Sequence, residues 1–140
     1  MLFKCNTGIY IANYNFVYLV SVQEAKMELK IDPDNKKNST LILAGSIGLS
    51  EAEGLRSLLI KALIDTDKIT IKADGVTELG VPALQLLCSA HRSALKLNKV
   101  LTFGDNCPVR IRGFMRDAGF ARTTGCSLDT QGSCLWCLGG

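Results

Sequence analysis

Strand-like and helix-like segments alternate along the chain from Met27 onward, and this alternation constrains the fold more than any other feature. The strand-like segments are short and carry apolar residues at every second position, which is the period of a half-buried β-strand. The helix-like segments space their apolar residues three and four positions apart, as in Leu55, Leu59 and Ala62, which gives a helix one buried face. We therefore expect an α/β domain with helical crossovers between parallel strands.

The expected order of elements is β-β-α-β-α-β-α, and the fold class is a small mixed, mostly parallel sheet of four to five strands covered by helices. Residues 32–37 carry the Pro, Asp and Asn residues that favour a turn between the first two strands. Gly45 is expected to end the second strand, and Gly119 to stop the last helix. The expected strands are 27–31, 39–44, 68–73 and 100–103, and the expected helices lie near 50–63, 82–97 and 109–118.

Two helix starts can be predicted from individual residues. Ser50 is expected to cap the first helix, with Glu53 three residues later completing a capping box. Pro82 suits the first turn of the second helix, because the N–H group that proline lacks would be unpaired there anyway. Residues 74–80, between the third strand and this helix, are expected to form a loop.

The composition is that of an ordinary globular domain. A chain of 140 residues, 47% hydrophobic and 21% charged, suits one domain with a core that needs no disulfide or metal. The net charge of +3 does not indicate a nucleic-acid-binding protein, which usually shows a strong basic stripe. We find no signal peptide and no apolar run of the roughly 18 residues that a membrane span needs. The expected location is the cytoplasm, where thiols stay reduced.

The first 26 residues differ from the rest of the chain. All three tyrosines lie there, and the run 9–22 is apolar and aromatic, so this segment is either a strand or hairpin or the product of a start codon assigned too early. In the second case the chain would begin at Met27, because the peptide Gln23-Glu24-Ala25 can be encoded by a ribosome-binding sequence. The expected division is an N-terminal extension, 1–26, a domain, 27–122, and a cysteine-rich tail, 123–140.

The most specific stretch runs from the third strand into the second helix and reads I-T-I-K-A-D-G-V-T-E-L-G-V-P-A-L-Q-L-L-C-S-A-H-R-S-A. It resembles the central motif of STAS domains, the family of bacterial anti-sigma-factor antagonists and their relatives. The L-A-G-S at the end of the second strand and the D-A-G-F near the end of the third helix support the resemblance. It covers about residues 27–121 and implies the STAS fold.

The resemblance also implies where a regulatory switch would lie. In the family this position usually reads D-S-S-G-L or D-T-A-A-L-Q-L-L, and the hydroxyl residue after the Asp is phosphorylated. Here Gly80 occupies the Asp position and Val81 occupies the hydroxyl position, so the scaffold is expected without its switch. The nearest hydroxyl groups belong to Thr77, expected to satisfy loop backbone, and to Ser89, expected on the helix surface.

The resemblance implies a non-catalytic bacterial adaptor that binds a kinase-like anti-sigma factor through the start of the second helix. Two other adaptor roles share this subtype, namely the cytoplasmic subunit of a lipid-transporting ABC system and an accessory of chemotaxis-type histidine kinases. No phosphate-cradling loop favours a nucleotide-binding variant. A homodimer through the aromatic segment or the tail stays open. The residues expected to contact the partner are Thr77, Glu78, Gly80, Val81, Pro82, Gln85, Ser89 and Arg92.

Six cysteines and one histidine are the remaining candidates for chemistry. Cys88 and His91 share a helix face and are interpreted as a core cysteine and a partly buried histidine. Cys126, Cys134 and Cys137 crowd the tail, where they could bind zinc with Cys107 or His91 as a fourth ligand, or act as a thiol redox sensor. The favoured interpretation is that Leu135, Trp136 and Leu138 pack the tail onto the domain, so no metal or cofactor is expected.

Four arginines lie in or near the third helix, and the sequence contains no recognised enzyme motif. A positive helix face can steer an acidic partner, although a solvated face is the favoured interpretation. No P-loop, dinucleotide fingerprint or catalytic triad is present, so no enzymatic activity is expected. The basic residues are Arg110, Arg112, Arg116 and Arg122.

Overall fold

The central strand of the sheet, β4 (Asn38–Ile47), defines the two faces of the domain. Its side chains alternate between buried and half-buried along the whole strand, because successive residues of a strand point to opposite faces. Leu41 and Leu43 are buried on one face, while Thr40 and Ile42 remain partly exposed on the other. The computed structural model describes residues 3–4, 10–11, 24–104, 107–122, 125–128 and 134–136.

Four strands form the main sheet in the order β3-β4-β5-β6. β3 (Lys26–Ile31) runs antiparallel to β4, whereas β5 (Lys68–Leu79) and β6 (Val100–Thr102) continue the sheet in parallel. The predicted mixed, mostly parallel sheet is confirmed. Within the N-terminal extension, β1 (Phe3–Lys4) pairs antiparallel with β2 (Tyr10–Ile11); the rest of the aromatic run 9–22 lies outside the described residues.

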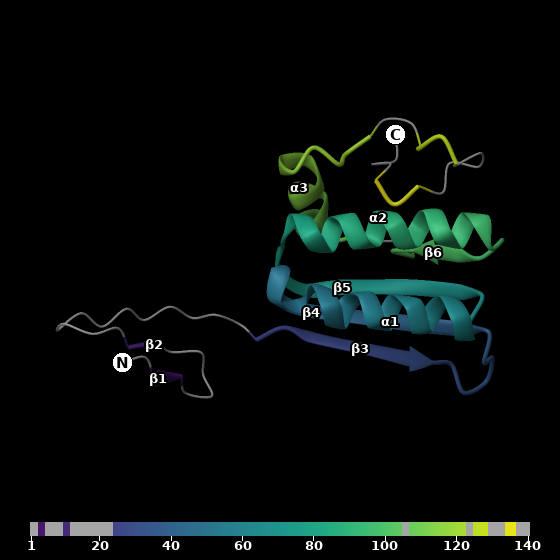
Figure 1. The fold of residues 1–140 in the computed structure, drawn as a ribbon, viewed down its shortest axis with the longest axis horizontal. Coiled ribbons are helices and arrows are strands. Elements are labelled where there is room, and N and C mark those ends of the chain that lie inside the picture. The colour runs from purple at the N-terminus through teal and green to yellow at the C-terminus, as the bar shows by residue number, and fades with distance from the viewer. Residues whose placement is uncertain are drawn as a thin grey trace.

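Helices cover one face of this sheet. A 3-10 turn, η1 (Leu49–Glu51), leads into α1 (Ala52–Asp65), which packs against α2 (Val81–Lys96). α3 (Val109–Asp117) lies near the amino end of α2 and contacts β5 (Figure 1). The element order predicted from Met27 onward is confirmed, with the core lying between the sheet and the helices.

Two strands extend further than the sequence predicts. β4 does not end at Gly45, because this glycine continues the strand with a φ of +79°. A Cβ atom at this position would lie 2.3 Å from the backbone oxygen of Glu24, so only glycine lets the chain that enters β3 pass this closely. The predicted loop 74–80 is wrong, since β5 continues to Leu79 through two irregularities where its register with β4 shifts.

The start of the first helix also differs from the prediction. Helical structure begins at Leu49, and the side chain of Glu51 accepts a hydrogen bond from the N–H group of Gly48 at 2.9 Å. Ser50 is therefore not the cap, and Glu53 is not its partner, because helical structure begins two residues earlier than the pattern suggests. The other two predictions hold: Pro82 lies in the first turn of α2, and Gly119 follows α3 with a φ of +78°.

The described part of the tail packs onto the domain as predicted for Leu135 and Trp136. Both side chains belong to the buried core. The Trp136 ring meets that of Phe120 edge-on, with centroids 5.3 Å apart, and the Trp136 carbonyl accepts a hydrogen bond from the N–H group of Arg122 at 2.8 Å. Leu138 lies outside the described residues.

Candidate protein-docking site

The junction between β5 and α2 is built around two glycines that lie close to each other. Gly80 is extended, with a φ of −75° and a ψ of 164°, and its carbonyl accepts the first hydrogen bond of α2 from Leu84. Its N–H group donates to the carbonyl of Ile47 at 2.8 Å. A Cβ atom on Gly80 would lie 3.4 Å from the Cα atom of Gly48. The junction therefore places the start of α2 directly beside the start of η1.

Two aliphatic side chains are exposed at this junction. Val81, the first residue of α2, is 47% exposed, and Leu49, the first residue of η1, is 77% exposed. Pro82 is half-buried, whereas the next two residues of α2 are fully buried in the core. The position that the STAS resemblance assigns to a phosphorylated hydroxyl is therefore on the surface, in an apolar setting. Leu49 is not among the contact residues predicted from the sequence, although an apolar residue just before a helix is a recognisable feature.

Thr77 and Glu78 approach the same junction from β5. Thr77 is the extra residue at the second register shift, between the pairs Gly45–Val76 and Ser46–Glu78, and it lies in a strand and not in a loop. Glu78 is exposed, and the Ser46 hydroxyl donates to its carboxylate at 3.3 Å. We call Leu49, Thr77, Glu78, Val81 and Pro82 the amino-end surface.

The other predicted contact residues continue this surface along α2. Gln85, Ser89 and Arg92 are exposed, and with Val81 they are spaced by four, four and three residues, which places them on one face of a helix. The three line a shallow hollow of about 370 Å³ together with Cys88, Ser93, Lys96 and Phe120. Val81, Gln85, Ser89 and Arg92 thus form one stripe along α2, apolar at its start and basic further along, whereas the Glu78 side chain is bonded to Ser46 on the sheet.

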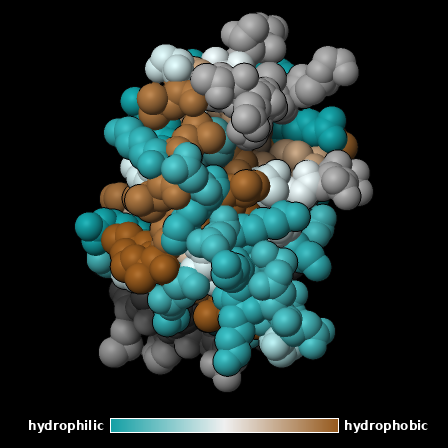
Figure 2. Space-filling view, turned by 90° about the vertical axis from the view of Figure 1, so that its right-hand side faces the viewer, coloured by the Kyte–Doolittle hydropathy of each residue, from teal (hydrophilic) through white to brown (hydrophobic). Residues whose placement is uncertain are grey.

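The opposite end of the domain has a different character. Figure 2 views the end where α1 and α2 finish and β5 begins, and hydrophilic side chains dominate it, with apolar side chains in separate patches. The exposed apolar residues Ile64 and Leu97 belong to this end, in the last turn of α1 and at the carboxyl-terminal cap of α2. The amino-end surface differs because its exposed apolar residues, Leu49 and Val81, each begin a helical segment.

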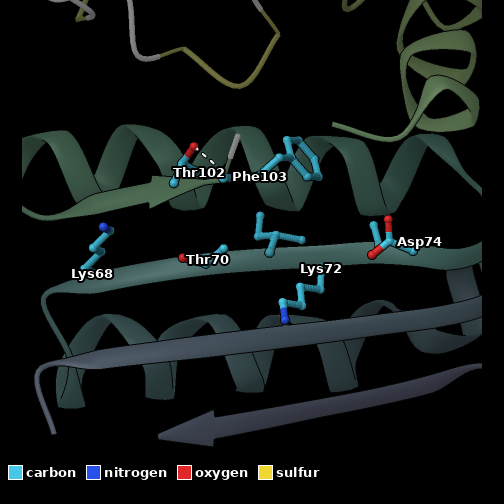
Figure 3. A pocket seen from close by; sticks show the side chains of 9 residues that line it. Lys68, Thr70, Lys72, Asp74, Thr102 and Phe103 are labelled. Carbon is cyan, nitrogen blue, oxygen red and sulfur yellow. Dashed lines mark hydrogen bonds between the residues drawn. The ribbon is translucent and has the colours of Figure 1, made fainter. Parts of the chain in front are cut away.

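A second hollow, of about 560 Å³, lies on the open face of the sheet. Figure 3 shows Lys68, Thr70 and Lys72 along β5, with Thr102 on β6, where the Thr102 hydroxyl accepts a hydrogen bond from the N–H group of Gly104. The two lysines are four residues apart on one strand, a separation of about 13 Å between their Cα atoms. In Figure 3 the ammonium groups of these two lysines point in different directions, so this arrangement does not gather them around one anion.

The arginines predicted around the third helix are all exposed. Arg112 donates two hydrogen bonds to the carbonyl of Cys107, at 3.2 and 3.1 Å, and therefore supports the turn that precedes α3. Burial raises the pKa of the Cys107 thiol, and the positive charge and hydrogen bonding of Arg112 oppose that rise.

The structure brings three of the candidate metal ligands together. His91 of α2 lies beside Cys126 and Cys134 of the tail, with their ligand atoms within 4.8 Å of one another. Within the described residues, Cys88 and Cys107 are outside this group. Cys88 packs partly buried against the core, as predicted, whereas His91 is almost fully buried. Cys137 lies outside the described residues.

Comparison with known proteins bears on the fold. No protein-family model and no curated protein matches the sequence. Among solved structures, the chain is similar to the Bacillus cell fate determinant SpoIIAA in its phosphorylated form, a STAS protein. This chain has the STAS fold. The likeness to SpoIIAA covers 68% of this chain and 85% of that one, with a TM-score of 0.53 and 13% sequence identity. None of the helices in the described part of the chain is long and apolar enough to cross a membrane.

Proposed function

We propose that this protein is a non-catalytic regulatory adaptor of the anti-sigma-factor-antagonist type in the bacterial cytoplasm, which binds a regulatory kinase or an anti-sigma factor through the amino-end surface. The observation that carries the proposal is the exposed, aliphatic Val81 at the first position of α2. In a phosphorylated STAS protein such as SpoIIAA, the resemblance assigns this position to a hydroxyl group. The adaptor is therefore not phosphorylated there.

The physical consequence of this substitution is that the first residue of α2 stays apolar and uncharged. A phosphate would add about −1.5 to −2 charges at pH 7, and the partial positive charge of a helix start would stabilise it. Val81 and Leu49 instead offer apolar area, and fully burying such a side chain contributes about 1.5–3 kcal/mol. The protein accordingly binds its partner without a phosphorylation-dependent release at this position.

The alternative adaptor roles use the same surface with different partners. An ABC transporter ATPase or a chemotaxis-type histidine kinase would also meet the stripe from Val81 to Arg92. The genes adjacent to the coding gene name the candidates to test: a kinase-like anti-sigma factor supports the proposal, and a transporter or histidine kinase favours an alternative.

A matched pair of charge substitutions tests the surface. Val81→Asp introduces a carboxylate at the amino-end surface, and we expect it to weaken binding of the purified partner by at least about tenfold, in line with an interface core position. Val100→Asp is the control, because Val100 is 48% exposed and lies at the start of β6, at the opposite end of the domain. Equal binding by both variants and the parent protein in calorimetry would place the contact elsewhere.

Phosphorylation is tested separately. The purified partner kinase and radiolabelled ATP are incubated with the parent protein and with Val81→Ser. We expect no label on the parent protein, including at Thr77 and Ser89, while label on Val81→Ser would show that only the hydroxyl is missing. Label on the parent protein would contradict the proposed independence from phosphorylation.

A further inference from the structure

The cluster of His91, Cys126 and Cys134 is independent of the docking surface and carries a separate inference. His91 is 3% exposed and Cys134 is 6% exposed, while Cys126 is half-buried. The three residues come from α2 and from two separate pieces of the tail, 125–128 and 134–136. Figure 1 shows the tail lying along α2, on the side away from β3. The fold thus gathers an imidazole and two thiols from distant parts of the sequence.

The geometry of the cluster matches a tetrahedral metal with little adjustment. Zinc binds thiolate sulfur at about 2.3 Å and imidazole nitrogen at about 2.0–2.1 Å, and the corresponding edges of a tetrahedron are about 3.4–3.8 Å. The ligand atoms here lie within 4.8 Å of one another, so a contraction of about 1 Å would bring them into contact with one ion. Side-chain rotation suffices for a movement of this size.

The donor set also selects the metal. Two thiolates and a neutral imidazole suit zinc, whereas magnesium and calcium prefer oxygen ligands. The two thiolate charges balance the charge of Zn²⁺, so the loaded site is neutral and its burial carries little electrostatic penalty. Three protein ligands leave one position of the tetrahedron for a water molecule or another donor.

We propose that His91, Cys126 and Cys134 form a zinc site that fastens the tail to α2. The ion connects α2 to both described pieces of the tail, and the aromatic contact between Phe120 and Trp136 secures the same region by packing. The loaded metal would restrain the tail, because its three ligands join α2 to two pieces of the tail, and a water molecule or another donor would complete the tetrahedron. Zinc binding requires both thiols in the thiolate form, so it releases protons and weakens as the pH falls.

The test uses the full chain, prepared without a polyhistidine tag or chelator and under reducing conditions. We expect about one zinc ion per chain by elemental analysis. Titration of the metal-free protein with Co²⁺ is expected to give the charge-transfer bands of cobalt–thiolate bonds and the intense visible bands of a tetrahedral ion. Competition between Zn²⁺ and a coloured chelator then gives the affinity, and thermal unfolding is expected to shift upward when zinc is added.

Single substitutions assign the ligands. Cys126→Ser and His91→Asn are each expected to lower zinc affinity by more than about tenfold, since even outer-shell changes cost this much. Cys88→Ser is the matched control, because Cys88 is also half-buried, lies on α2 one turn before His91, and is outside the cluster. Circular dichroism checks the fold, and Cys126→Ser keeps the test decisive if His91→Asn unfolds.

Three results would overturn the proposal. The first is less than about one tenth of a zinc ion per chain in the parent protein, with no cobalt–thiolate bands on titration. The second is equal zinc affinity in Cys126→Ser, Cys88→Ser and the parent protein. The third is a disulfide between Cys126 and Cys134, detected by mass spectrometry in protein purified with zinc present and without added reductant, because thiolates bound to zinc would resist oxidation.

Discussion

α2 carries the two regions for which we propose functions, and they differ in how they are built. Its amino end exposes Val81 beside Leu49, and its middle buries His91 beneath the tail. The amino end is fixed by the sheet, because the paired strands β4 and β5 finish there and bring residues 48 and 80 together. The middle depends on residues more than thirty positions away, which return only when the tail folds back. The comparison teaches that one helix can present a surface to a partner and serve as an internal anchor for its own chain.

The largest effect is expected where the tail meets the domain. Trp136→Ala removes a side chain that is 1% exposed and stacks edge-on with Phe120, so we expect a loss of about 3–5 kcal/mol in the free energy of unfolding. Urea denaturation measures it. Trp136→Phe is the control and should cost less, because it keeps most of the ring and removes an Nε1 atom that is buried without a hydrogen-bond partner. A loss below about 1 kcal/mol for the alanine variant would show that the tail adds little to the core.

The next largest loss of stability is expected where β4 contacts the residues that lead into β3. Gly45→Ala places a Cβ atom against the Glu24 backbone at a residue with positive φ, and we expect a loss of about 1–3 kcal/mol. Gly113→Ala is the matched control, because a Cβ there meets nothing within 4 Å and alanine favours a helix by about 0.5–1 kcal/mol. Differential scanning calorimetry of both variants gives the comparison. Equal melting temperatures would mean that residues 24 and 25 do not pack over β4.

A smaller effect is expected at the amino end of α2. Val81→Asp should leave the free energy of unfolding unchanged or raise it by about 0.3–1 kcal/mol, because a carboxylate at a helix start interacts favourably with the helix dipole. Chemical denaturation of this variant and of Val100→Asp separates stability from binding. A loss above about 2 kcal/mol would assign Val81 to the core and remove the contrast between the two regions of α2.

The smallest effect concerns a cysteine outside the tail cluster. Because burial raises the pKa of Cys107 and Arg112 opposes the rise, Arg112→Gln should raise this pKa further and slow alkylation at pH 8 by a few-fold, since the thiolate is the reactive form. The folded state then keeps this proton while the unfolded state loses it, so stability falls as the pH rises above the ordinary thiol pKa of about 8.5. Alkylation followed by peptide mass spectrometry measures the rate. A faster reaction in the variant would contradict the assigned role of Arg112.

The sequence predicts the features of this fold that depend on short-range periodicity. The strand around Leu41 and Leu43 and the buried helix face at Leu55 and Leu59 follow from spacing alone. The cap at Gly48 and the continuation of β4 through Gly45 do not, because glycine usually marks an end, whereas here it permits close backbone approach.

The two candidate sites also differ in how far the sequence predicts them. The residues around Val81 follow from a contiguous motif, and their exposure confirms only that they are accessible. The group of His91 with Cys126 and Cys134 could not be chosen from the sequence over other combinations, because the path of the tail decides it. Spacing gives candidate ligands, and tertiary packing selects among them.

The two register shifts in β5 have a consequence for how related chains should be aligned. Each shift lets β5 take one residue more than β4 over the same length, so between the two shifts a side chain faces the direction opposite to the one that simple alternation from Lys68 assigns. A relative without these extra residues would need a gap between positions 72 and 78 for its following helix to align with α2. Counting backward from the fixed start of the helix at Gly80 gives the correct equivalence, whereas counting forward along the strand misplaces it by up to two residues.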